Sequence, residues 1–249
     1  MRKKIVSALA AAAIMAIYAT PAKAQDIFDS GDMRPHFGAR LSLDISNVAG
    51  NIDNYFEENA IPDLTNSGAG FTVMGVYNIP LYKNLYFEPG LGIYYNTVGL
   101  NGTHYDFRPN PEQPESPIGV ADYAIDGSVR NWGFRIPMLA GYHFDFTDNM
   151  RVSVFTGPQI NIGFYQKMVY DVHYIGDSGV PADEHVSASC YGHGFRRFDM
   201  QWVFGAGYHY GRYSVAISGG VGMTNLVDGQ FSGYKARRNT FSITLGYDF

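Results

Sequence analysis

The sequence of 249 residues contains a single cysteine, Cys190, which excludes an internal disulfide bond. Long apolar runs are also missing after residue 24, since none approaches the roughly 20 residues that a membrane-spanning helix needs. Positive charge is scarce: 18 Lys and Arg stand against 23 Asp and Glu, which gives a formal net charge of −5. This balance argues against a nucleic-acid partner.

The first 24 residues have the three parts of a secretory signal peptide. Met1–Lys4 is basic, Ile5–Tyr18 is apolar and rich in alanine, and Ala22–Ala24 has the small-residue pattern of a cleavage site. We therefore expect Sec-type export to the periplasm and a mature domain of Gln25–Phe249. The leader holds four positive charges and no acid, so its removal changes the formal charge from −5 to −9 (−5 − 4).

Period-2 alternation is what the sequence has in abundance, and residues 240–249 show it most clearly. Apolar and aromatic residues alternate there with small or polar ones, which is typical of a strand with one face in an apolar medium. The last of them, Leu245, Tyr247 and Phe249, resemble the sorting signal by which the barrel-assembly machinery recognises bacterial outer-membrane proteins. A membrane protein without helical spans must be a closed β-barrel, because only closure pairs every backbone group in lipid.

Eight segments alternate in this way, and each is long enough for a tilted transmembrane strand of about 9–11 residues. They are Phe37–Ile45, Gly70–Ile79, Leu85–Tyr95, Asn131–Phe144, Arg151–Phe164, Phe198–Tyr210, Tyr213–Met223 and Thr240–Phe249. Their connections alternate in length. The short ones are Pro80–Asn84, Asp145–Asn149 and Gly211–Arg212, and the long ones are Ser46–Ala69, Val98–Val129, Gln166–Arg197 and Asn225–Arg238.

These connections predict the topology, because outer-membrane barrels place short turns in the periplasm and long loops outside the cell. We expect an all-β fold: an eight-stranded, antiparallel, monomeric transmembrane β-barrel in contact with outer-membrane lipid. Aromatic residues near both ends of the strands predict two interfacial belts. A soluble two-sheet barrel would also alternate, but it explains neither the belts nor the loop lengths. Pro89, Pro137 and Pro158 lie inside strands and predict bulges or irregular pairing.

Charged residues in the cores of the strands all fall on the face opposite the apolar one. They are Arg40, Asp44, Glu88, Arg135 and Asp199. We expect them in a lumen just wide enough to be filled by side chains. There they could form a ladder of ion pairs that plugs the barrel, with Glu88 and Arg135 on adjacent strands, or a gate for small ions. His143 and His209 share this face, as polar filling or as a pH-sensitive gate.

Several segments resemble the PorT-like outer-membrane β-barrel family of Bacteroides-type bacteria. They are Phe134–Phe144 with its I-P-x-L pattern, Phe155–Pro158, Gly219–Leu226 and Phe241–Phe249. The resemblance covers nearly all of the mature chain and implies an eight-stranded barrel in the outer membrane. It does not imply one activity, because the family's namesake serves a secretion apparatus while most members have no assigned role.

One connection carries residues of the metal-binding and nucleophilic types: Asp183, Glu184, His185, Cys190 and His193. Their spacing matches no compact motif, so a solvated loop and a metal site both remain open. A hydrolase site could also be built from loop residues such as His104, Asp106, Asp183 and His185.

The alternation of Arg151–Phe164 continues to Tyr174, which predicts a hairpin that projects beyond the membrane and pairs with residues before Phe198.

From these features we expect a non-enzymatic membrane scaffold without a cofactor, whose long acidic loops contact an extracellular or envelope protein. A narrow gated pore for ions or small solutes is the alternative, and a loop-borne hydrolase is the second alternative. The sequence identifies neither the partner nor a ligand.

Overall fold

The computed structural model describes residues 34–51, 67–108, 118–147, 149–174, 184–191, 194–229 and 233–249. The expected signal peptide, residues 1–24, lies outside these ranges. The named elements are all β-strands: β1 (His36–Gly50), β2 (Ser67–Tyr82), β3 (Leu85–Arg108), β4 (Ile118–Thr147), β5 (Met150–Tyr174), β6 (Glu184–Ser189), β7 (Phe198–Tyr210), β8 (Tyr213–Gly222) and β9 (Ala236–Asp248). None of the described residues belongs to a helix long and apolar enough to cross a membrane.

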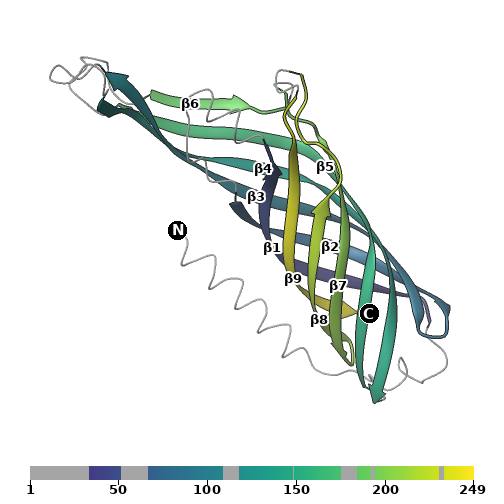
Figure 1. Ribbon diagram of the computed structural model, residues 1–249. Coiled ribbons are helices and arrows are strands. Elements are labelled where there is room, and N and C mark those ends of the chain that lie inside the picture. The colour runs from purple at the N-terminus through teal and green to yellow at the C-terminus, as the bar shows by residue number, and fades with distance from the viewer. Residues whose placement is uncertain are drawn as a thin grey trace.

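Eight of the strands in the described ranges form a closed antiparallel ring (Figure 1). Its order is β1, β2, β3, β4, β5, β7, β8 and β9, and β9 pairs back onto β1 from Gly38 opposite Asp248 to Gly50 opposite Ala236. Each ring strand therefore has a neighbour on both sides, which leaves no open edge within the barrel wall. The predicted eight-stranded antiparallel barrel is confirmed.

The two faces of the wall differ as the alternation predicts. On β1, Leu43 and Ile45 are 51% and 60% exposed on the outer face, whereas Asp44 between them is 3% exposed in the lumen. The same contrast recurs around the ring. The large apolar side chains that remain exposed point outward, and the buried polar ones point inward. An apolar outer face around a polar interior is the arrangement of a transmembrane barrel.

Two strands, β3 and β4, are much longer than the alternation indicates. β3 runs on to Arg108 and β4 begins at Ile118, within the segment Val98–Val129 that we expected to be a loop. Glycines such as Gly99, Gly102 and Gly127 obscure the pattern there, because glycine is depleted in strands. The two segments nevertheless pair with each other, which satisfies their backbone groups.

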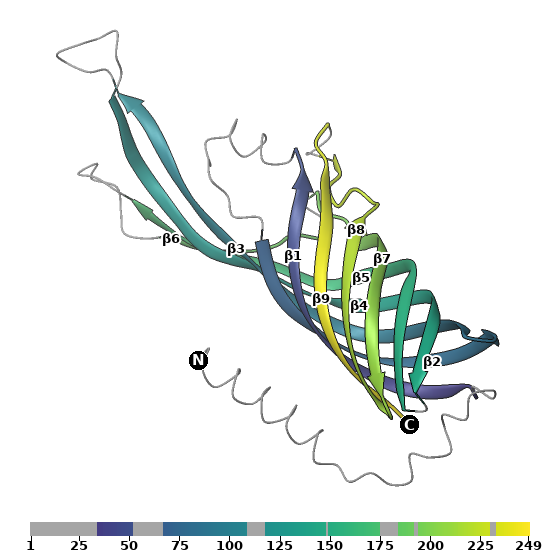
Figure 2. The same ribbon diagram turned by 60° about the horizontal axis from the view of Figure 1, so that its bottom comes forward.

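The extended parts of β3, β4 and β5 leave the barrel together as one sheet, which β6 widens (Figure 2). We call the sheet formed by residues 99–108, 118–129, 167–174 and 184–189 the projecting sheet. Its β5–β6 pairing, from Lys167–Ser189 to Val172–Glu184, confirms the predicted hairpin ahead of Phe198.

Pro89, Pro137 and Pro158 lie where the hydrogen-bonded ladder is interrupted without a shift in register. Between β3 and β4 the pairing stops after Pro89–Met138 and resumes at Gly92–Arg135 in the same register. Pairing between β4 and β5 likewise skips two positions after Pro137 opposite Gln159. Of the two predicted alternatives, bulges or irregular pairing, the structure has irregular pairing, since a missing N–H removes one hydrogen bond without inserting a residue.

Candidate functional site: the barrel lumen

A buried ion pair between Arg135 and Asp44 crosses the lumen in the half of the barrel nearer the long loops. Arg135 Nη1 lies 2.7 Å from Asp44 Oδ2, and both side chains are buried. Asp44 also accepts hydrogen bonds from the hydroxyls of Thr72 (2.7 Å) and Ser242 (2.6 Å). Four strands (β1, β2, β4 and β9) are therefore tied together through one carboxylate. Such charge-assisted hydrogen bonds are stronger than neutral ones.

Asp199 forms the second centre of the same layer. It accepts hydrogen bonds of 3.2 Å from the side-chain amides of Asn161 and Gln201, and Arg238 lies 3.8 Å away. Asn161 in turn accepts a 3.1 Å hydrogen bond from Arg135 Nε, which joins this centre to Asp44. Asn161 and Gln201 are almost completely buried. We call this network around Asp44 and Asp199 the lumen plug, because its buried side chains are hydrogen-bonded to one another across the lumen.

Loop residues cover the plug on the long-loop side. Tyr191 enters the barrel mouth and donates a 3.3 Å hydrogen bond to Asn131, while the Arg197 guanidinium lies 4.8 Å from the centre of the Tyr191 ring. A side chain at Gly163 would overlap the Tyr191 hydroxyl, so a larger residue there would displace Tyr191 from this position. Beside Tyr191, an apolar cluster of Leu226, Val227 and Ala236 packs with Val48, Phe195 and Tyr234.

A second set of charges centres on Arg40, nearer the short turns. Its guanidinium contacts Asp248 at 2.7 Å and Glu88 at 3.0 Å. His36 lies 3.8 Å from the far oxygen of Asp248, and Asn78 donates a 3.4 Å hydrogen bond to Glu88. Arg40 thus balances two carboxylates at once, and it joins β1, β3 and β9 across the lumen.

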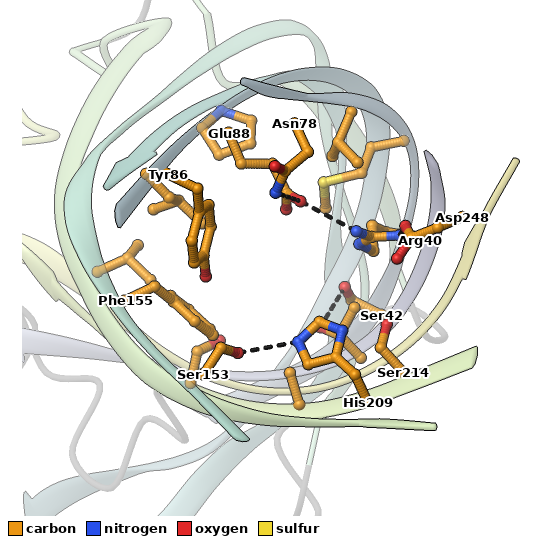
Figure 3. A pocket seen from close by; sticks show the side chains of 18 of the residues that line it. Arg40, Ser42, Asn78, Tyr86, Glu88, Ser153, Phe155, His209, Ser214 and Asp248 are labelled. Atoms are coloured by element: carbon orange, nitrogen blue, oxygen red, sulfur yellow. Dashed lines mark hydrogen bonds and ion pairs between the residues drawn. The ribbon is translucent and has the colours of Figure 1, made fainter. Parts of the chain in front are cut away.

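A cavity of about 90 Å³ lies among these groups (Figure 3). Tyr86 and Ser153 line it on the side opposite Arg40, and Ser153 Oγ lies 3.0 Å from His209 Nε2. Two buried atoms on its wall, Asn78 Oδ1 and His143 Nδ1, have no protein hydrogen-bond partner among the described residues. A cavity of this size with charged and polar groups on part of its wall has room for a few water molecules, and it is far smaller than the roughly 300 Å³ of a typical ligand pocket.

All five strand charges singled out in the sequence lie in the lumen, but their pairing differs from the expected ladder. Glu88 and Arg135 do not pair, because Arg135 faces Gly92 on β3, four residues or about 13 Å along the strand from Glu88. Each finds its partner across the lumen instead.

Two further charged residues of the lumen, Asp248 and Arg238, were not predicted from the sequence. Asp248 stands between Tyr247 and Phe249 and therefore on the inward face, a signal that was available in the alternation. Arg238 fell within a segment assigned to a loop, Asn225–Arg238, whereas β9 already begins at Ala236.

Most of the candidate metal and hydrolase residues lie outside the part of the chain that the structure describes. Asp183 and His193 lie outside the described residues, as do the side chains of His104, Asp106 and Glu184. His185 contacts Asp171 at 2.5 Å on the exposed face of the projecting sheet, away from buried Cys190. Among the described residues, no group of three or more His, Cys, Asp or Glu could hold a metal ion.

The thiol of Cys190 is not an activated nucleophile. Burial raises the pKa of this thiol to about 11, because the thiolate would be poorly solvated there. The thiol is therefore protonated near neutral pH, whereas reactive cysteines have a lowered pKa. At the surface, the pKa of Asp228 is instead lowered, first by the backbone N–H of Gly229 and then by Arg196.

A closed ring of eight antiparallel strands with an apolar outer face and a filled polar lumen defines an outer-membrane-type β-barrel. The chain belongs to the family of the outer membrane protein beta-barrel domain, which its residues 24–228 match. Membership places the protein in the bacterial outer membrane. No curated protein matches the sequence.

Solved structures similar to this chain include Ail, the attachment invasion locus protein of Yersinia pestis, in complex with the heparin analogue sucrose octasulfate. It is 10% identical, with 87% of this chain and 100% of that chain covered and a TM-score of 0.40. Neisserial surface protein A is 11% identical, with 86% and 97% covered and a TM-score of 0.38. The outer membrane protease OmpT of Escherichia coli is 8% identical, with 89% and 100% covered and a TM-score of 0.39.

Proposed function

We propose that this protein is a non-enzymatic outer-membrane scaffold that presents its projecting sheet to an extracellular or envelope protein. The observation that carries the proposal is the continuation of β3, β4 and β5 beyond the ring. The last pair between β2 and β3 is Gly68–Val98, whereas β3 remains paired with β4 as far as Arg108. From residue 99 onward β3 therefore has one unpaired edge within the described ranges.

The projecting sheet offers two such edges, the outer part of β3 and the whole of β6. Backbone groups at a sheet edge can pair with an added strand, which is a common mode of protein recognition. Acidic residues are present on the same sheet, where Asp126 lies opposite Asp171. These features favour a protein partner that contributes a strand or basic side chains, and the acidic chain argues against a nucleic acid.

The lumen supports a non-enzymatic role in a different way. Its one Ser–His contact among the described residues, Ser153 with His209, opens onto a cavity with room for water and little more. A hydrolase needs a substrate to reach the nucleophile, together with groups that stabilise the developing charge. We therefore assign the lumen residues to structure rather than to catalysis.

A narrow gated pore is the second candidate, and the hydrated cavity beside Arg40 and Glu88 favours it. Currents through a planar bilayer separate the two proposals. We expect the refolded protein to be silent, because the lumen plug closes the cross-section. Folding is checked by its faster migration in SDS before boiling.

Stable current steps that change in a Glu88→Gln variant would contradict the scaffold proposal and establish a pore. Asp228→Asn is the control, because Asp228 lies outside the lumen and its substitution should leave any currents unchanged.

The proposal includes the route to the membrane and a PorT-like family assignment. We infer Sec-type export, removal of residues 1–24, and recognition of Leu245, Tyr247 and Phe249 by the barrel-assembly machinery. Deletion of Phe249 should lower the amount of protein in the outer-membrane fraction and leave processed Gln25–Asp248 in the periplasm. Substitution of the outward Phe241, which lies at the other end of β9, should have a smaller effect. Equal outer-membrane levels of wild type and deletion variant would remove Phe249 from the proposed signal.

A further inference from the structure

Two positive charges lie directly opposite each other on the outer face of the barrel. Arg130 on β4 pairs in register with Lys167 on β5. Like charges in this arrangement repel each other and destabilise the strand pair. Neither side chain has an ion-pair partner among the residues that the structure describes. Within the described part of the chain, no carboxylate offsets these two charges.

Hydroxyl groups extend this pair into a row of four hydrogen-bond donors. Thr97 on β3 is in register with Arg130, and Ser189 on β6 is in register with Lys167. Residues opposite each other on neighbouring strands point to the same face of a sheet, so the four side chains of Thr97, Arg130, Lys167 and Ser189 lie side by side. We call them the basic row. It contains no acid.

The basic row lies at a defined depth relative to the membrane. The next row toward the short turns is aromatic and consists of Tyr95, Trp132 and Tyr165, with the rings of Tyr95 and Trp132 4.8 Å apart. Tyrosine and tryptophan mark the level of the lipid head groups in membrane proteins. Two residues along a strand span about 6.8 Å, so a strand tilted by about 40° raises the basic row by about 5 Å above the aromatic one.

We infer that the basic row binds the phosphate group of an outer-leaflet lipid. A phosphate monoester carries between −1.5 and −2 charges near pH 7, which would offset both cations. The Arg130 guanidinium can bind two phosphate oxygens at once, and the Lys167 ammonium and the two hydroxyls can donate to the third oxygen or the ester oxygen. The acyl chains of the same lipid would lie against the aromatic row and the apolar wall below it.

This lipid site is independent of the proposed scaffold function, although both involve β4 and β5 (Figure 2). It uses Thr97 and Arg130 on the barrel wall with Lys167 and Ser189 at the foot of the projecting sheet, and it needs neither a protein partner nor a closed lumen. Failure of either proposal would leave the other intact.

Native mass spectrometry of the folded protein in detergent can test the site, with a diphosphorylated glycolipid of the lipid A type as probe. The double variant Arg130→Gln/Lys167→Gln should bind this lipid about tenfold more weakly, because it loses its charge-assisted contacts. Arg237→Gln is the matched control. Arg237 is an exposed cation at the same end of β9, but it lies opposite Ala49 rather than a second cation. The affinity of the Arg237→Gln variant for the glycolipid should change less than twofold, because isolated surface charges interact weakly.

Two further arms identify the chemical group and its source. The same glycolipid without its phosphates should bind wild type and the double variant equally well. If wild type retained the phosphorylated and the dephosphorylated glycolipid to the same extent, the proposal would be overturned. Inorganic phosphate should not displace the glycolipid at equal concentration. Full displacement would show a site for free anions and contradict a lipid site. An equal loss of binding in Arg237→Gln would show general attraction to basic residues and would also contradict it.

Discussion

The substitution Asp44→Ala should lower the free energy of unfolding by about 3–5 kcal/mol, the range measured when one member of a buried ion pair is removed. Arg135 would keep its charge in the middle of the lumen without the carboxylate that now lies 2.7 Å away. The hydroxyls of Thr72 and Ser242 would lose their acceptor at the same time. Urea titration of the protein folded into lipid vesicles measures the loss.

The matched control is Asp228→Ala, which removes an ion pair of similar length. Arg196 Nη2 lies 3.0 Å from Asp228 Oδ2, but both side chains are exposed to water. Solvent screens such pairs, so this variant should unfold almost as wild type does. Similar stability of Asp44→Ala and Asp228→Ala would mean that water enters the lumen freely. The lumen plug would then be open, which would also weaken the scaffold proposal.

A double variant separates the loss of the ion pair from the loss of packing. Asp44→Leu with Arg135→Met replaces both charges by apolar side chains, and similar replacements of buried ion pairs elsewhere are neutral or stabilising. The double variant should therefore recover most of the stability that Asp44→Ala loses. Recovery of stability in the double variant would show that the charges of the lumen plug are not the source of the barrel's stability. Their role would then be to determine which side chains meet in the lumen.

The barrel was predictable because its signal is local. Alternation within Phe198–Tyr210 indicates one strand without reference to any other part of the chain, and β7 has the same bounds. Membrane contact makes the signal strong, since each outward position has to be apolar. The inward positions of Arg40, Asp44 and Asp199 follow from the same argument.

The partners of the lumen charges were not predictable, because they depend on features that no local pattern records. Arg40 meets Glu88 and Asp248, residues 48 and 208 positions away in the sequence. Strand register and tilt determine which inward side chains reach the same level, and alternation specifies neither. The ends of β3 and β4 were missed for a related reason: glycines weaken the local signal, while the pairing between the two strands is non-local.

The basic row shows the same division between local and non-local information. Arg130 and Lys167 lay beyond the expected ends of their strands: Arg130 directly precedes the expected strand Asn131–Phe144, and Lys167 lies in the expected loop Gln166–Arg197. Only the register of β4 on β5 places them opposite each other, and a shift in that register between Trp132 and Gly133 decides it. Without the shift, Lys167 would no longer lie opposite Arg130, and its side chain would point to the other face of the sheet.

The substitution Ile217→Arg should destabilise the folded protein by about 2–4 kcal/mol in a lipid bilayer, which is the range for arginine on the lipid face at the bilayer midplane. Ile217 lies at the middle of β8, between Ala206 on β7 and Ile243 on β9, and its side chain is 54% exposed on the outer face. Its neighbours on that face offer no carboxylate to pair with the new charge.

Depth in the membrane supplies the control for this experiment. Met223 is outward-facing and similarly exposed, but it follows the end of β8 on the long-loop side. Met223→Arg should cost about 0–1 kcal/mol, because a long cationic side chain near the interface reaches water. Unfolding of both variants in the same vesicles gives the difference. Equal and small losses would mean that Ile217 does not lie in hydrocarbon, and they would favour a soluble barrel over a membrane-spanning one. A large loss at Ile217 alone would follow from a lipid-facing wall, because water solvates arginine equally well at both positions of a soluble barrel.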